Sequence, residues 1–318
     1  MKRFGIITVM YLSLLVLVLP LEGAEKSSAI DPSSSSKPRT VNELYPGLTT
    51  RAMSWAIAST LPEGVLLRAG ELVIETKELI EEIGKAPEQM RPKLKKNAFF
   101  ILEQVATFKL LLTKARAEAV KSGKDIQEKD EQTIIQDYLR ALVKTAKVSD
   151  EKILDFYKGN TEMFGGASLA QMKPQIEQFL LRQKQQELID EHIRTIGRRM
   201  RIEISASWLK VQAALARDNV VDKARASGRN SLVDFGSTRC VPCEMMAPIL
   251  ETLREKYKGK VNILFVHVGE EPILASRYGV QSIPVQIFFD KTGKEAFRHV
   301  GFFAQEQIEK KLAEMGVE

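Results

Sequence analysis

The chain has 318 residues, of which 44% are apolar and 28% are charged, and its formal net charge is +6. This composition excludes a collagen-like chain, bulk disorder and a polytopic membrane protein. The length is enough for two domains, and the mild positive charge does not by itself require a nucleic-acid partner.

Residues 1–24 have the pattern of an export signal. Lys2 and Arg3 precede an apolar run over residues 4–19, and small residues follow at positions 23–24. The apolar run is also close to the shortest helix that spans a membrane, so an uncleaved anchor is the alternative. No cysteine stands directly after the run, which argues against a lipoprotein. We therefore expect an exported, periplasmic protein that either loses this segment or stays tethered by it.

Residues 25–40 are rich in Ser, Lys and Pro and have almost no apolar content, which predicts a flexible linker. Residues 41–205 instead carry apolar residues at helical spacing, and we expect a mostly helical domain there. The clearest predicted helices cover residues 98–119, 149–157 and 168–199. Short β-like pieces are expected to pair and close the domain, at residues 65–68, 72–74 and 201–204.

The order of these elements resembles the N-terminal helical domain of periplasmic SurA/PpiC-type chaperones. The hairpin leads into IETKEL at 74–79, and VSDEKILDFY follows at 148–157, ahead of a long helix and a short strand. No catalytic parvulin domain accompanies these segments. The resemblance implies binding of partly folded client proteins without prolyl isomerase activity. A plain helical spacer or a dimerisation module is the alternative.

Residues 206–318 differ in character and predict an α/β domain. Strands are expected at 231–235, 261–268, 285–289 and 295–300, and helices at 218–225, 240–257, 272–278 and 305–315. A βαβ unit followed by a hairpin and a closing helix gives a central mixed sheet. The predicted fold class is therefore multidomain, with a mostly helical N-terminal domain and an α/β C-terminal domain.

The chain has only two cysteines, Cys240 and Cys243, and they lie between a predicted strand and a predicted helix. A structural disulfide framework would use more cysteines. A zinc site would need more ligands than two cysteines. The three histidines, His192, His267 and His299, are not at ligand spacing around the pair. A lone C-x-x-C in an exported protein therefore predicts redox chemistry.

The position of the pair suits that chemistry, because the attacking species is a thiolate. The N-terminus of a helix has partial positive charge and free N–H groups, which favour the thiolate. Arg239 adds a full positive charge if its side chain points toward the sulfur. Pro242 fits the first turn of the helix, where its missing N–H costs little.

Residues from about 219 to 316 resemble thioredoxin. The matching residues are VDF at 233–235, CVPC at 240–243, Pro248, YGV at 278–280, SIP at 282–284 and VG at 300–301. The resemblance implies a thioredoxin fold in which Cys240 and Cys243 react. It also implies that Pro284 is a cis-proline, which shapes the groove and offers a backbone edge to an extended substrate. Asp234 would be the buried acid that helps to deprotonate the second cysteine.

The chain departs from the thioredoxin pattern around the motif. Residues 237–239 (STR) stand where the family has its tryptophan, and Val241 replaces a glycine. Glu244 replaces a basic residue, and Phe265 stands at the position of a buried lysine. These changes leave the two-cysteine chemistry intact. They leave open the redox potential, the partner and the tuning of Asp234.

We therefore expect an exported thiol–disulfide oxidoreductase that acts on protein disulfides, with a helical domain that holds clients. Its expected partners are protein clients with thiols or disulfides and a membrane or periplasmic redox partner, with no nucleic acid, cofactor or metal. One alternative is a chaperone or adaptor with a structural disulfide. Another is a membrane-tethered electron carrier for a dedicated pathway. The direction of electron transfer and the oligomeric state stay open.

Overall fold

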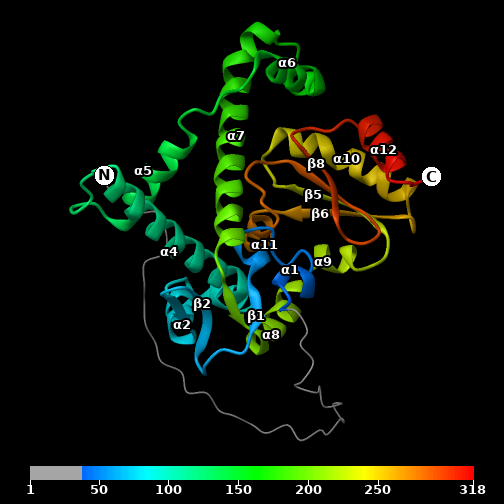
Figure 1. The fold of residues 1–318 in the computed structure, drawn as a ribbon. Coiled ribbons are helices and arrows are strands. Elements are labelled where there is room, and N and C mark those ends of the chain that lie inside the picture. The colour runs from blue at the N-terminus through cyan, green and yellow to red at the C-terminus, as the bar shows by residue number, and fades with distance from the viewer. Residues whose placement is uncertain (1–37) are drawn as a thin grey trace, which may run out of the picture.

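The structure is a computed structural model that describes residues 38–318 (Figure 1). The predicted export signal and nearly all of the predicted linker lie outside these residues. The described chain forms an N-terminal unit that ends with α8 and a C-terminal unit that starts with α9. No helix among residues 38–318 is both long and apolar enough to cross a membrane.

The N-terminal unit is mostly helical, as predicted. Its helices are α1 (Val41–Leu44), α2 (Thr76–Gly84), α3 (Arg91–Lys96), α4 (Ala98–Lys121), α5 (Glu131–Val143), α6 (Asp150–Gly159), α7 (Leu169–Arg199) and α8 (Ala206–Arg217). Its 3-10 turns are η1 (Ala52–Trp55), η2 (Glu88–Met90) and η3 (Thr161–Phe164). Its strands are β1 (Ile57–Ser59), β2 (Val65–Ala69), β3 (Leu72–Glu75) and β4 (Glu203–Ser205).

The small sheet of this unit confirms the predicted pairing of a hairpin with a strand that lies far along the chain. β2 and β3 form an antiparallel hairpin, and β4 pairs antiparallel with β2, with Ile204 opposite Leu67. β1, which the sequence analysis did not predict, pairs parallel with β4. The strand order is β1-β4-β2-β3. β4, the strand that follows α7, therefore lies inside the sheet and joins β1 to the hairpin.

The core of the N-terminal unit is built around α4. Phe99 and Leu102 are buried there, and the same core includes Leu209 of α8. Glu103 of α4 is also buried, with 2% of its surface exposed, and it accepts hydrogen bonds from Thr49 Oγ1 (2.7 Å) and Met53 N (3.3 Å). Burial raises the pKa of this carboxyl above its ordinary value.

The C-terminal unit is an α/β domain around a mixed sheet in the order β6-β5-β7-β8. β5 is parallel to β6, and β7 is antiparallel to both β5 and β8. The elements are α9 (Val220–Arg225), β5 (Asn230–Gly236), α10 (Val241–Lys256), β6 (Val261–His267), α11 (Pro272–Arg277), β7 (Val285–Phe289), β8 (Glu295–Val300) and α12 (Gln305–Glu314).

The alternation of side chains along β5 divides the helices between the two faces of the sheet. Leu232 packs with residues of α10 and α12, such as Leu250 and Ile308. Val233 points to the other face and packs with residues of α9 and α11, such as Leu274. Every residue of β5 is buried, as expected for a central strand that is covered on both faces.

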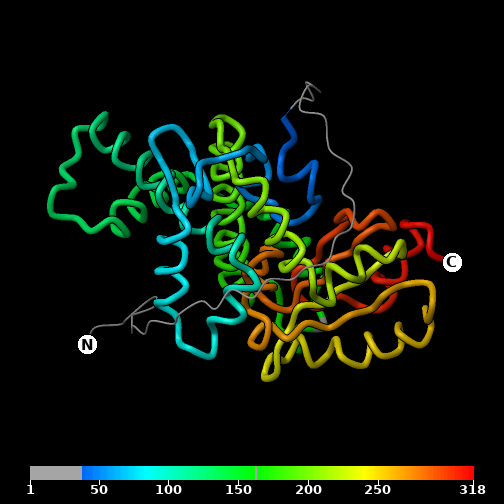
Figure 2. Tube along the Cα trace, turned by 90° about the horizontal axis from the view of Figure 1, so that it is seen from below, coloured from blue at the N-terminus to red at the C-terminus, as the bar shows by residue number. Residues whose placement is uncertain are grey.

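The two units are joined at both ends of α7, which lies beside the C-terminal unit in two views (Figures 1 and 2). At one end, Arg225 Nη1 donates to the carbonyl of Gly47 (3.3 Å), and Ile273 of α11 packs into the N-terminal core. Gly47 has φ +74°, and a Cβ there would lie 2.0 Å from the Arg225 guanidinium. At the other end, Phe302 N donates to Met163 Sδ in η3 (3.3 Å).

A buried charged cluster stabilises the first of these junctions. Asp222 accepts from Arg277 Nη2 (3.1 Å) and from the Tyr278 hydroxyl (2.9 Å), and it pairs with Arg225 (3.2 Å). The side chains of Asp222 and Arg277 are each only 4% exposed. The cluster therefore fixes α9 against α11 next to the contact that Arg225 makes with the N-terminal unit.

Candidate active site

Cys240 and Cys243 form a disulfide at the N-terminus of α10, with 5.2 Å between their Cα atoms. β5 ends at Gly236, and a short loop leads into Cys240, the N-cap residue of the helix. Within residues 38–318, the exposed Arg239 in this loop is the one non-glycine residue with a left-handed φ, +62°. Pro242 lies in the first helical turn, as predicted. The loop and the proline together place both sulfurs at the start of the helix.

The two cysteines differ in accessibility. Cys243 is 5% exposed, whereas Cys240 is only half-buried. A partner molecule can therefore reach Cys240 while Cys243 stays covered. α10 has 16 residues, and the free N–H groups and dipole at its N-terminus favour negative charge on Cys240 when the pair is reduced.

Asp234 is fully buried in the middle of the sheet, with 0% of its surface exposed. Gln286 lies opposite it on β7, and Gln286 Nε2 donates to Asp234 Oδ1 (2.7 Å). Asp234 Oδ2 has no hydrogen-bond partner in the described part of the chain. Burial raises the pKa of Asp234 to about 6, against the smaller opposing effects of the Gln286 hydrogen bond and the charge of Arg254.

Asp234 lies on the face of the sheet that the disulfide covers. Asp234 and Gly236 are two residues apart on β5, so their side-chain positions share one face. A Cβ at Gly236 would lie 3.4 Å from Cys243 Sγ. The buried carboxyl is therefore on the same side of β5 as the less accessible cysteine.

The peptide bond between Ile283 and Pro284 is cis, as the resemblance implied. In the antiparallel register Phe235 pairs with Val285, which brings Pro284 opposite Gly236. The carbonyl of Pro284 accepts a hydrogen bond from Gly301 N (2.9 Å). This hydrogen bond joins the loop that carries Pro284, the proline loop, to the loop after β8, next to the end of β5 from which the chain leads to Cys240.

Phe265 and His267 of β6 complete the surroundings of the pair. The ring of Phe265 is 42% exposed, and its Cε2 would lie 2.9 Å from a Cβ at Gly236. His267 Nε2 accepts a hydrogen bond from Thr238 N (3.2 Å), so it holds the loop that precedes Cys240. An apolar ring therefore stands beside the cysteines where the thioredoxin pattern has a lysine.

The sequence analysis identified Asp234 and Pro284 but missed two polar side chains around the acid. Gln286 is fully buried in an otherwise apolar strand, and that break in the pattern was a signal that it needs a partner. Arg254 of α10 donates to the carbonyl of Ile263 (3.2 Å) and contributes positive charge near Asp234. Its approach to the acid depends on how α10 packs on the sheet.

Comparisons with known proteins agree with this geometry. Residues 211–314 match the family described as Thioredoxin. The chain is 45% identical over 91 residues to the thioredoxin of Staphylococcus saprophyticus, a match that covers 29% of this chain and 86% of that protein. It is 47% identical over 77 residues to the thioredoxin of Staphylococcus aureus, which covers 24% of this chain and 73% of that protein.

Among solved structures, the crystal structure of the thioredoxin NaTrxh from Nicotiana alata is 31% identical. The match covers 31% of this chain and 82% of that chain, with a TM-score of 0.28.

The mixed sheet, the cysteine pair at a helix N-terminus and the adjacent cis-proline define a thioredoxin-fold protein with a redox-type site. The matched relatives identify the family. Through its C-terminal unit the chain belongs to the thioredoxin family, a family of thiol–disulfide oxidoreductases.

Proposed function

We propose that the protein is an exported thiol–disulfide oxidoreductase that acts on protein disulfides through Cys240 and Cys243. The observation that carries this proposal is the unequal exposure of the two sulfurs at the start of α10. The sulfur of Cys240 is open to a partner molecule, whereas the sulfur of Cys243 is covered and is bonded to that of Cys240. The buried carboxyl of Asp234, with a pKa of about 6, supplies a proton acceptor on the same face near neutral pH.

The reaction has two exchange steps, and it starts from the dithiol form. The Cys240 thiolate attacks one sulfur of a substrate disulfide, which forms a mixed disulfide and releases a substrate thiolate that takes up a proton. Cys243 then loses its proton toward Asp234 and attacks Cys240 Sγ. This step forms the Cys240–Cys243 disulfide and releases the second substrate thiol. The substrate gains two electrons, and the protein loses them.

The same steps run in reverse from the disulfide form that the structure contains. A substrate dithiol then attacks Cys240 and leaves as a disulfide, while the protein becomes a dithiol. The direction depends on the reduction potentials of the protein, the client and the compartment. A membrane or periplasmic redox partner would restore the starting state.

We further propose that the N-terminal unit holds client proteins, as the resemblance to SurA/PpiC-type chaperones implies. The paired segments β2, β3 and β4 around a helical core support this reading. The test uses the full chain with both cysteines replaced by serine, so that only binding is measured. Suppressed aggregation of a reduced client protein would support a holding function. If a several-fold molar excess of the protein does not suppress aggregation of the client, the N-terminal unit would be a spacer without client binding.

Alkylation tests the redox proposal directly. The protein is treated with mild reductant at neutral pH, then with iodoacetamide, and the labelled cysteines are identified by mass spectrometry. Cys240 is expected to label first and Cys243 more slowly, because only Cys240 is accessible. A disulfide that stays unlabelled unless the protein is denatured would be structural, and the proposal would be wrong.

Export is tested on the protein recovered from cells. N-terminal sequencing is expected to find a chain that begins close to residue 25. An intact N-terminus in a membrane fraction would support the tethered alternative, and an intact N-terminus in the cytoplasm would exclude export.

A further inference from the structure

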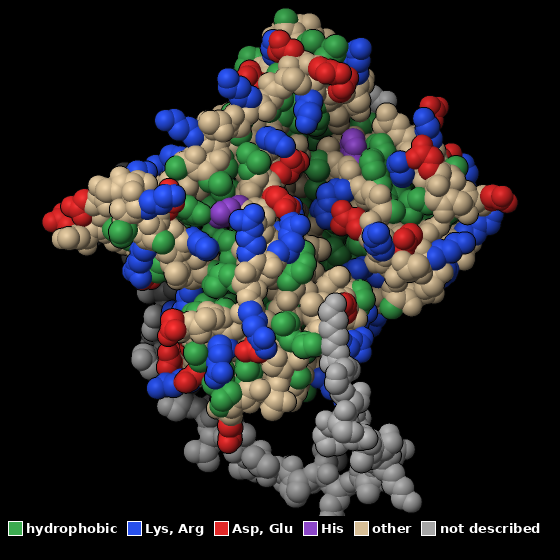
Figure 3. Space-filling model, in the orientation of Figure 1, with side chains coloured by type: hydrophobic (Ala, Val, Ile, Leu, Met, Phe, Trp, Pro, Cys, Tyr) green, Lys and Arg blue, Asp and Glu red, His purple; other side chains and the backbone are tan. Residues whose placement is uncertain are grey.

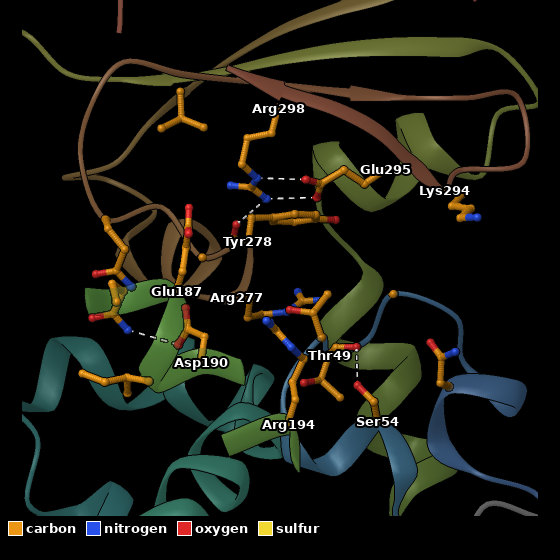
Figure 4. A pocket seen from close by; sticks show the side chains of 18 of the residues that line it. Thr49, Ser54, Glu187, Asp190, Arg194, Arg277, Tyr278, Lys294, Glu295 and Arg298 are labelled. Atoms are coloured by element: carbon orange, nitrogen blue, oxygen red, sulfur yellow. Dashed lines mark hydrogen bonds and ion pairs between the residues drawn. The ribbon is translucent and has the colours of Figure 1, made fainter. Parts of the chain in front are cut away.

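A large cleft separates the two units (Figure 3). Its volume is about 1940 Å³. Figure 4 shows Glu187, Asp190 and Arg194 pointing into it from the N-terminal unit, opposite Arg298 and Glu295 of β8. Charged side chains of both signs line the cleft.

The cleft reaches the loop that carries the cis-proline. Gln281 and Ser282, which lead into the cis-proline Pro284, line the cleft. Val300, the last residue of β8, lines it as well. Pro284 lies opposite Gly236 in the strand register, so a polypeptide that runs from Pro284 along the loop toward Ser282 and Gln281 reaches the cleft.

The opposite flank of the redox site is covered by the turn that connects α6 to α7. Asn160 Oδ1 lies 3.0 Å from the position of a Cβ at Gly301. Met163 Sδ accepts a hydrogen bond from Phe302 N, and Met163 packs against the core beneath α10. The N-terminal unit therefore occupies the surface of the loop after β8, and the cleft is the flank that stays open.

The polar lining of the cleft fits the backbone of an extended polypeptide. Each residue of such a segment has an N–H donor and a C=O acceptor that need partners. Four glutamines line the cleft: Gln183, Gln185, Gln186 and Gln281. A glutamine side-chain amide can both donate and accept hydrogen bonds. These groups can bind a backbone whatever its side chains are. The volume is about twice the upper limit of roughly 1000 Å³ for small-molecule sites, which favours a polypeptide.

We propose that this cleft binds an extended segment of the client polypeptide on one side of the cysteine that reacts with Cys240. The inference rests on the proposed oxidoreductase function and assigns it a substrate class: unfolded or extended protein segments, bound with little dependence on sequence. α7 supplies one wall of the site, and the proline loop of the thioredoxin domain supplies the other. Binding therefore needs both units.

The test narrows the cleft from each wall in turn, in the full-length oxidised protein. One variant carries Gln183→Trp and Gln186→Trp on α7, and a second carries Gln281→Trp on the proline loop. The matched control is Gln178→Trp, an exposed glutamine of α7 that does not line the cleft. Binding is measured as the fluorescence anisotropy of a dye-labelled, cysteine-free, unfolded polypeptide. The reduced form of each protein is also reacted with glutathione disulfide.

Both cleft variants are expected to bind the unfolded polypeptide at least about tenfold more weakly, as the loss of one or two hydrogen bonds would give. The Gln178→Trp control should bind like the wild type, and all four proteins should react equally with glutathione disulfide. No binding by the wild type, or binding by both cleft variants that is as tight as that of the wild type, would overturn the cleft assignment. If the variants lose binding while no protein reacts with glutathione disulfide, the cleft assignment stands and the oxidoreductase proposal fails.

Discussion

Replacing Asp234 by asparagine should stabilise the C-terminal unit at neutral pH. The folded protein raises the pKa of this carboxyl from 3.8 to about 6 because the group is buried. A shift of about two pKa units corresponds to about 3 kcal/mol, the free energy lost when the buried group ionises. Between pH 4 and pH 6 the folded state binds more protons than the unfolded state. Wild-type stability therefore falls as the pH rises through this window and levels off above it.

Asparagine keeps the shape and the contact with Gln286 but does not ionise. The stability advantage of Asp234→Asn over the wild type should grow by about 3 kcal/mol between pH 3 and pH 8. Tryptophan fluorescence would not report this change, because Trp55 and Trp208 both belong to the N-terminal unit. Urea unfolding followed by hydrogen-exchange mass spectrometry of β5 peptides measures the C-terminal unit itself.

A difference between variant and wild type that does not change with pH would refute this reasoning. It would mean that Asp234 keeps an ordinary pKa, and that burial between α10 and the sheet does not desolvate the carboxyl. The group would then be no better a proton acceptor for Cys243 than any surface aspartate.

Three further predictions concern the disulfide and the junctions between the units. Cys243→Ser should accumulate a mixed disulfide between Cys240 and a client, visible on a non-reducing gel, because the resolving thiol is gone; a gel without adducts would contradict the two-step reaction. Asp222→Ala should cost about 3–5 kcal/mol in unfolding experiments because it leaves buried arginines unpaired, whereas exposed Asp218→Ala should change the melting temperature little. Gly301→Ala places a side chain at φ +104° and should cost of the order of 1–3 kcal/mol; an unchanged melting temperature would show that the loop adapts.

Most of the C-terminal fold follows from local patterns in the sequence. The short, mostly apolar segments that become β5 and β7 lie where expected, because a strand buried on both faces carries apolar residues at most of its positions. β1 was missed because its local sequence carries no such signal. Its three residues, Ile57–Ser59, are too few for a periodic signal, and it becomes a strand by pairing with β4, which lies far along the chain.

The site was predictable where a residue's role depends on its position next to the motif. Cys240 and Pro242 are examples of this. The cis bond before Pro284 was instead an expectation from the resemblance to thioredoxin. Contacts between distant segments were not predictable, because helical and strand periodicity describe only which face of an element is apolar. The hydrogen bond from Phe302 to Met163 joins residues 139 positions apart, and neither residue stands out from its neighbours in the sequence. The cleft between the units depends on such contacts.

The central claim is that Cys240 and Cys243 form a redox-active pair, and its most direct test is a redox titration. The purified protein is equilibrated with glutathione buffers at neutral pH, and the fraction of disulfide is measured by alkylation, with Cys240→Ser as the control. A redox-active pair should equilibrate reversibly, at a potential between roughly −270 and −120 mV. A potential below about −300 mV, or no equilibration without denaturant, would identify a structural disulfide and rule out redox activity at this pair.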